Sequence, residues 1–132
     1  MKLVRPSELE LQVLSLLWER GPSSVRELLE AMPDRKQRAY TSVLSVMQVM
    51  EKKGLLGHTR EGLTHIYHPL VQREQVLRPL MKELLRNVFG GSPSAAVQFL
   101  LDEAAVDDDE LTEIRRTIRE HARRHKEQGE DQ

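Results

Sequence analysis

The chain has 132 residues, of which 39% are hydrophobic and 31% charged, a composition typical of one compact soluble domain or of a small domain with an appended helical module. No apolar run approaches the roughly 18 residues that span a bilayer, and the N-terminus has no signal-peptide pattern. The sequence contains no cysteine, which excludes disulfides and thiolate chemistry. We therefore expect a cytoplasmic protein without a membrane partner. The net charge is −1, but residues 31–60 hold six Lys and Arg against two Asp and Glu, and such a local field can attract a polyanion.

Two helices with capping-box signatures open the chain. Ser7 is followed by Glu10, and the apolar residues after it recur at helical spacing until a Gly-Pro pair at residues 21–22. A second helix is expected to begin at Ser23 or Ser24, with Glu27 completing the box after Ser24. Its predicted buried side consists of Val25, Leu28, Leu29 and Met32.

A third helix is expected over residues 39–53, ending at Gly54, because glycine readily follows a helix C-terminus. Its two sides differ in character, which predicts one side packed in a core and the other facing out. The apolar side consists of Val43, Val46, Met47 and Met50, and the polar side of Thr41, Ser45, Gln48 and Lys52.

After Gly54 the periodicity changes from helical to alternating. Residues 56–59 and 63–68 are expected to be two short strands, joined by a three-residue turn at residues 60–62 and closed by Pro69. This interpretation places Arg60 at the tip of the hairpin.

Three further helices are predicted. The first begins near Gln72 with a broad apolar stripe, and Pro79 within it predicts a kink or a later start, because proline donates no backbone hydrogen bond. A Gly-Gly pair ends it, a short helix is expected over residues 93–103, and the acidic run at residues 107–110 favours the start of a last helix through the helix dipole. We expect the tail from about Lys126 to fray.

The order of these elements predicts a mainly α protein with a small β-hairpin. Three helices and a hairpin in about 65 residues are typical of a winged helix-turn-helix, in which the third helix enters the DNA major groove. We therefore expect a winged-helix DNA-binding domain over residues 1–70 and a helical dimerisation region over residues 71–132.

The polar side of the third helix carries short side chains of the kind that touch base edges, and the basic residues before it suit phosphates. The predicted DNA-binding residues are Arg35, Lys36, Arg38, Tyr40, Thr41, Ser42, Ser45, Gln48 and Arg60. Two alternatives stay open: the polar side is merely a solvated helix face, or the winged helix binds another protein and not DNA.

Catalysis and metal binding find little support in the sequence. It contains no nucleophile elbow, phosphate-binding glycine loop or carboxylate dyad, so we expect no enzyme and no cofactor. His121 and His125 stand one helical turn apart, a spacing that can clamp a metal, but no third ligand is near in sequence. A solvated, arginine-rich helix face is the favoured interpretation, so we expect no metal.

Several segments, in their order and spacing, resemble the penicillinase-repressor (BlaI/MecI/CopY-type) family over roughly residues 6–120. They are ELELQVLSLLW at 8–18, YTSV at 40–43, MEKKGLL at 50–56, IYHPL at 66–70 and VFGGS at 88–92. The resemblance implies a homodimeric repressor that binds a dyad-symmetric DNA operator and blocks transcription. It also raises a sensor protease as a second partner, a point left open here.

The sequence departs from the family pattern at informative positions. Leu44 and Ser45 stand where characterised relatives often have lysine and threonine, so base preference does not carry over. Copper-responsive members have clustered C-terminal cysteines, which this chain lacks. The β-lactam-responsive relatives are cleaved at an Asn-Phe bond, where this chain has Gln98-Phe99. The glutamine puts that route in doubt, and Phe99 as a plain core residue is the favoured interpretation.

The helices of residues 72–122 are too few and too one-sided to bury their apolar faces alone. A second copy would cover them, and two-fold symmetry would set two recognition helices about one DNA turn, or a multiple of it, apart. The predicted dimer residues are Leu77, Leu80, Leu84, Val88, Phe99, Leu100, Ile114 and Ile118. The alternative is a monomer in which this segment folds back on its own N-terminal domain.

Overall fold

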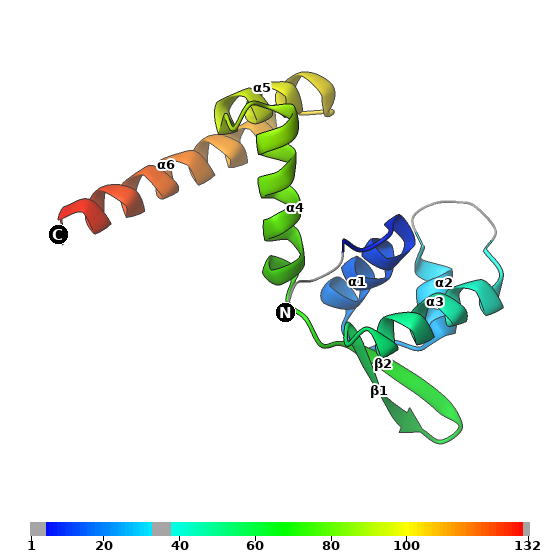
Figure 1. Ribbon diagram of the computed structural model, residues 1–132. Coiled ribbons are helices and arrows are strands. Elements are labelled where there is room, and N and C mark those ends of the chain that lie inside the picture. The colour runs from blue at the N-terminus through cyan, green and yellow to red at the C-terminus, as the bar shows by residue number, and fades with distance from the viewer. Residues whose placement is uncertain (1–4, 33–37, 131–132) are drawn as a thin grey trace. The chain divides into compact units, whose positions relative to one another are not determined.

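The computed structural model describes residues 5–32 and 38–130 (Figure 1). Its elements are α1 (Glu8–Arg20), α2 (Val25–Ala31), α3 (Tyr40–Lys52), β1 (Leu56–Glu61), β2 (Thr64–Pro69), α4 (Arg73–Val88), α5 (Pro93–Glu103) and α6 (Asp108–Glu130). The order confirms the mainly α winged-helix fold. The chain divides into two compact units, residues 1–84 and 85–132. In the part of the chain described, no helix has the length and apolar character needed to cross a bilayer.

Both predicted capping boxes are present. The Glu10 amide donates to the Ser7 hydroxyl at 3.2 Å, and the Ser7 amide donates to the Glu10 carboxylate at 2.9 Å. Ser24 and Glu27 repeat the arrangement at 3.2 and 3.0 Å. Ser24, and not Ser23, is therefore the N-cap of α2, because its side chain accepts a bond from an otherwise unpaired amide at the helix start.

The core of the first unit lies between α1, α2, α3 and the hairpin. Its fully buried members come from each of these elements: Val13, Leu14, Leu17, Leu28, Val43, Met47, Met50, Leu56 and Tyr67. The predicted core side of α3 is confirmed at Val43, Met47 and Met50, while Val46 is half-buried against the same cluster. At the end of α3, Gly54 has a φ of 82°, and the Leu55 amide reaches back to the Met50 carbonyl at 2.9 Å. The predicted glycine stop is thus a Schellman motif.

The hairpin differs from the predicted one at its turn. β1 and β2 pair from Leu56↔Pro69 to Glu61↔Thr64, so the turn contains two residues, Gly62 and Leu63, and not three. Gly62 has a φ of 63° at the first turn position, as in a type II′ turn, which matches the right-handed twist of the strands. The predicted tip position of Arg60 is therefore wrong: Arg60 lies within β1 opposite His65, and Leu63 at the tip is 99% exposed.

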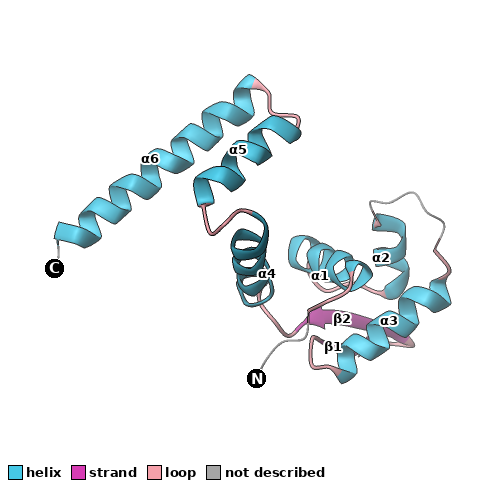
Figure 2. Cartoon of the chain, turned by 45° about the horizontal axis from the view of Figure 1, so that its top comes forward, coloured by secondary structure: helices cyan, strands magenta, loops and turns pink. Residues whose placement is uncertain are grey.

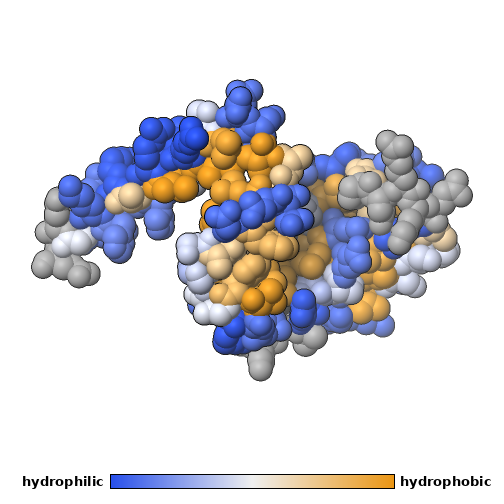
Figure 3. All heavy atoms as spheres, turned by 90° about the horizontal axis from the view of Figure 1, so that it is seen from above, coloured by the Kyte–Doolittle hydropathy of each residue, from blue (hydrophilic) through white to orange (hydrophobic). Residues whose placement is uncertain are grey.

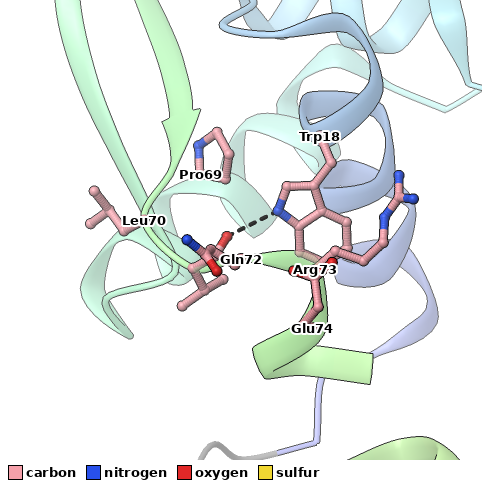
Figure 4. A pocket seen from close by; sticks show the side chains of 7 residues that line it. Trp18, Pro69, Leu70, Gln72, Arg73 and Glu74 are labelled. Atoms are coloured by element: carbon pink, nitrogen blue, oxygen red, sulfur yellow. Dashed lines mark hydrogen bonds between the residues drawn. The ribbon is translucent and has the colours of Figure 1, made fainter. Parts of the chain in front are cut away.

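The first part of α4 packs on the winged helix. The Trp18 indole N–H donates to the Val71 carbonyl at 2.9 Å, and the Arg73 guanidinium lies 5.9 Å from the Trp18 ring (Figure 4). Val76 is buried in the core, and Leu80 packs against it. α4 starts at Arg73 and passes through Pro79, so the late start that proline suggested does not occur. The first compact unit extends past residue 70, where the sequence places the end of the winged-helix domain.

The second unit exposes much of its apolar surface. Within residues 85–129 no side chain is fully buried, and Phe99, favoured as a core residue, is 56% exposed with its ring 5.8 Å from that of Phe89. Figure 3 shows this apolar surface beside the charged side of α6. α6 continues to Glu130, past the point where fraying was expected, and an Arg123–Glu127 pair at 3.3 Å, one turn apart, supports its last turns.

The ion pair between α1 and α3 makes stability depend on pH. Burial acts to raise the pKa of Glu10, but hydrogen bonds from Ser7 and the Lys53 ammonium, 3.1 Å away, outweigh it and lower that pKa. A lowered folded-state pKa contributes stability above the ordinary Glu pKa of about 4.3, and this contribution is lost as pH falls through the folded value.

We predict that Glu10→Gln lowers the free energy of unfolding by about 1 kcal/mol at pH 7, because glutamine can keep the cap but not the charge-assisted bond to Lys53. Urea unfolding should show this gap narrowing as the pH falls below the ordinary Glu pKa and the wild-type carboxyl gains its proton. Glu8→Gln, an exposed change in the same helical turn, is the control and should have little effect. A gap that does not narrow as the pH falls until the protein unfolds would contradict the prediction.

Candidate nucleic-acid interface

One helix supplies both core and interface. On α3 the side chains of Val43, Met47 and Met50 have no exposed surface. Leu44, Val46 and Glu51 are half-buried, and the remaining side chains of the helix are exposed. The exposed set contains the predicted Thr41, Ser42, Ser45 and Gln48. Thr41, Ser45 and Gln48 follow each other at four and three residues, so they form one stripe along the helix. The structure thus brings the predicted base-reading residues onto one face.

The predicted residues that flank this stripe differ in how far they are exposed to solvent. Tyr40 is 42% exposed at the first turn of α3, and Arg38 just before it is half-buried. Arg35 and Lys36 lie outside the described residues. Lys53 is held by Glu10, while Lys52 is exposed at the end of the stripe.

Sequence reasoning missed Arg26 on α2. Its guanidinium lies 5.7 Å from the centre of the Tyr40 ring, a cation–π distance, so it adds a positive charge beside the start of α3. The sequence carries no signal for this contact, because it depends on how α2 and α3 pack together.

A groove separates α3 from the hairpin, and Figure 2 shows the two elements lying against each other. Beside the C-terminal half of α3 the groove has a volume of about 530 Å³. Its lining there consists of Gln48, Glu51, Lys52, His58, His65 and Tyr67. Arg60 reaches the groove face through its side chain, which donates from Nε to His65 Nε2 at 3.4 Å. Arg60 therefore lies on the same face of the hairpin as His65, which lines the groove.

Tyr67 closes the floor of this groove. Burial, and to a lesser degree the Glu51 carboxylate and Tyr40, raise the pKa of its phenol above the ordinary value, so the ring is neutral under ordinary conditions. Two backbone hydrogen bonds with Ser23, at 3.0 and 2.8 Å, fix its position. The floor is thus fixed and uncharged, while the α3 side of the groove carries Glu51 and Lys52.

The chemistry available here is recognition. Hydroxyl and amide groups on α3 can donate to and accept from base edges, and the surrounding Arg and Lys side chains can contact phosphates. Among the described residues, no three His, Cys, Asp or Glu side chains gather in a way that could hold a metal ion.

Comparison with known proteins identifies the family. The sequence model of the penicillinase repressor family matches residues 6–120, most of the chain. The chain belongs to the penicillinase repressor family. The resemblance seen in the sequence is thereby confirmed.

Two relatives in this family span nearly the whole chain. The transcriptional regulator BlaI of Mycobacterium tuberculosis (strain CDC 1551 / Oshkosh) is 34% identical over 121 residues, which cover 90% of this chain and 86% of the relative. The penicillinase repressor of Bacillus licheniformis is 21% identical over 126 residues, covering 96% and 98%. Both names are those of regulators of gene expression and not of enzymes.

A solved structure also matches. It is the solution structure of the Bacillus licheniformis BlaI monomeric form in complex with the blaP half-operator, with a TM-score of 0.47 and 22% sequence identity. The match covers 55% of this chain and 89% of that one.

Proposed function

We propose that this protein is a transcriptional repressor of the penicillinase repressor family that binds duplex DNA with the exposed side of α3. The observation that carries the proposal is the division of α3 into an apolar side packed in the core and an exposed stripe of short polar side chains. Such a helix is held rigidly by its own core while its free side can enter a major groove. Family membership and the names of the relatives support the same function.

Different residues in this interface would have different tasks. Thr41, Ser42, Ser45 and Gln48 would read base edges, since hydroxyls serve several bases and a glutamine amide pairs well with adenine. Arg38, Tyr40 and Arg60 would contact the phosphate backbone, with Arg35 and Lys36 assigned to it from the sequence. Arg26, beside Tyr40, joins this second group.

We predict that Ser45→Ala and Gln48→Ala change the enriched sequence when the protein selects from a random duplex DNA pool. Arg38→Ala and Arg60→Ala should instead weaken binding to all sequences, and each should reduce the slope of log affinity against log salt by about one. The measurement is sequencing of the selected pool, followed by titrations at several salt concentrations.

The matched controls are Ser15→Ala on α1 and Arg78→Ala on α4, both exposed and away from the α3 stripe. They should behave as the wild type. A wild-type protein that enriches no sequence would overturn sequence-specific binding, and a protein that binds no DNA at all would favour a role in protein recognition.

We further propose that the chain acts as a homodimer on a dyad-symmetric operator. The second unit supports this, because its helices leave Val88, Phe99, Leu100 and Ile118 from 56 to 65% exposed in a single copy. Fully covering an apolar side chain of this size contributes roughly 1.5–3 kcal/mol, so a partner copy would stabilise the unit strongly. A two-fold axis would then repeat the α3 interface on the DNA.

The remaining predicted dimer residues have distinct surroundings. Leu77 and Leu84 on α4 are 37 and 44% exposed, and Ile114 on α6 is half-buried. Leu80 packs against the core of its own winged helix, so it would support the contact surface from beneath. The division into a DNA-binding part, residues 1–70, and a dimerisation part, residues 71–132, stays a proposal, as does a sensor protease as a second partner.

We predict that Leu100→Glu converts the protein to a monomer in sedimentation equilibrium and lowers its affinity for a two-half-site DNA more than for a single half-site. A charge in a buried apolar contact opposes association, because the carboxylate must lose its water. Ser94→Glu, on the polar side of the same helix, is the control and should leave the dimer intact. A wild-type mass that stays monomeric at all concentrations would overturn the symmetric arrangement.

A further inference from the structure

We propose that Val49 on α3 reads the methyl group of a thymine in the DNA major groove. The inference rests on the proposed DNA-binding function and names one base-selecting residue of that same surface. It is carried by an apolar side chain that the fold leaves exposed among the polar side chains proposed to read base edges.

Val49 differs from the other apolar side chains of its helix. Five of the six Val, Leu and Met side chains of α3 lie in the core of the first unit or pack against it: Val43, Leu44, Val46, Met47 and Met50. Val49, the sixth, belongs to neither group, and it is 47% exposed. The core therefore gives no reason for a valine at this position.

Local helix stability gives no reason for Val49 either. Valine is branched at Cβ, so it loses side-chain freedom against the preceding turn and is a poorer helix former than alanine, lysine or glutamate. Single exposed apolar residues are nevertheless common on protein surfaces. What distinguishes Val49 is its place on the helix.

Val49 lies on the side of α3 that we propose to face DNA. Ser42, Ser45 and Val49 follow each other at three and four residues, so they share one face of the helix. Ser42 and Ser45 are exposed and belong to the proposed base-reading set. A duplex whose base edges contact these two hydroxyls therefore meets Val49 one helical turn beyond Ser45.

The charges near Val49 allow DNA to approach this part of α3. Lys52, three residues after Val49, is exposed and can contact a phosphate. Glu51 is the acidic residue of α3, and it lies half-buried on the other flank, where it lines the groove to the hairpin. There its carboxylate accepts a hydrogen bond from His58 Nδ1 at 2.6 Å. Phosphates near Val49 would thus meet a lysine and not the carboxylate.

Thymine is the base that fits an exposed valine. In the major groove thymine presents a methyl group, whereas cytosine presents an amino donor that would lose its water beside an aliphatic side chain. Burying one methyl group contributes about 0.8 kcal/mol, which corresponds to about fourfold in affinity. The helix rises about 6 Å from Ser45 to Val49, close to two base steps of about 3.4 Å. The thymine should therefore lie within about two base pairs of the pair that Ser45 contacts.

The test removes the methyl group from the DNA. On a duplex with the sequence selected by the full-length wild-type protein, each thymine is replaced in turn by deoxyuridine, which pairs in the same way but has no methyl group. Affinities are measured by fluorescence anisotropy at one salt concentration. At one thymine this replacement should weaken wild-type binding about fourfold. That thymine should lie within about two base pairs of the position whose preference Ser45→Ala changes.

The matching protein variant is Val49→Ala. It should bind the thymine and uracil duplexes equally at that position, because the group that contacts the methyl is gone, while other thymines keep their wild-type effect. Alanine favours a helix more than valine does, and Val49 is not part of the core, so thermal unfolding should show no loss of stability. A weaker affinity of this variant for the thymine duplex then cannot come from a damaged α3.

Val97→Ala is the control. Val97 is also a helical valine, 43% exposed, but it lies on α5 in the second unit. This variant should keep the wild-type ratio of thymine to uracil affinity at every position, even if a change in the second unit alters the affinity for both duplexes.

The inference and the proposed function fail differently. A protein that binds no DNA, or that selects no sequence, overturns sequence-specific DNA binding and the reading by Val49 with it. A protein that selects a sequence without a thymine in the expected region overturns the role of Val49 alone. The same holds for a protein whose thymine-to-uracil effects all persist in Val49→Ala.

Discussion

The arrangement of the winged helix depends on one short contact between distant segments, the pair of backbone hydrogen bonds that joins Ser23 to Tyr67. Ser23 lies in the tight connection between α1 and α2, and Tyr67 lies near the end of the hairpin. The bonds therefore attach β2 to the helical part as if Ser23 were a single residue of a third strand. Because the Tyr67 side chain is buried in the core at the same point, the hairpin has one position relative to α3.

That constraint gives α3 its double role. The inner side of α3 is buried in the core, so the helix cannot rotate or slide without opening a cavity. Its C-terminal end is also fixed, by the Schellman motif at Gly54 and by the Lys53–Glu10 pair to α1. Leu44 is half-buried against the core and lines the groove to the hairpin. The outer stripe is thus presented on a rigid support, as a surface that reads DNA requires.

The second unit is stabilised in a different way. Its helices have good local signals, including the Ser92 cap of α5 and the charge pairs Arg116–Glu113 and Arg123–Glu127 of α6, but residues 85–129 bury no side chain fully. Local signals can hold a helix without giving it a tertiary core. A unit of this kind is suited to complete its packing with a second copy, which is why the dimer and the DNA interface belong to one functional proposal.

The sequence by itself determined the features that depend on neighbours along the chain. The two capping boxes, the glycine stop of α3, and the apolar and polar sides of that helix follow from spacing alone, and the structure has them where the sequence indicated. The order of the elements also followed from the changes in periodicity along the chain, and the structure has the same order. Comparison confirmed the family resemblance.

Only the tertiary structure decided which residues from different elements meet. The turn at Gly62 and Leu63 follows from a register that buries Tyr67 and Leu56, and this register moves Arg60 from the tip into the strand. Arg26 over Tyr40, and Glu51 beside His58, join elements whose relative position is set by core packing. Periodicity along one helix or strand shows which side faces inward, but not which neighbour that side will meet, because side-chain packing between distant segments fixes the pairing.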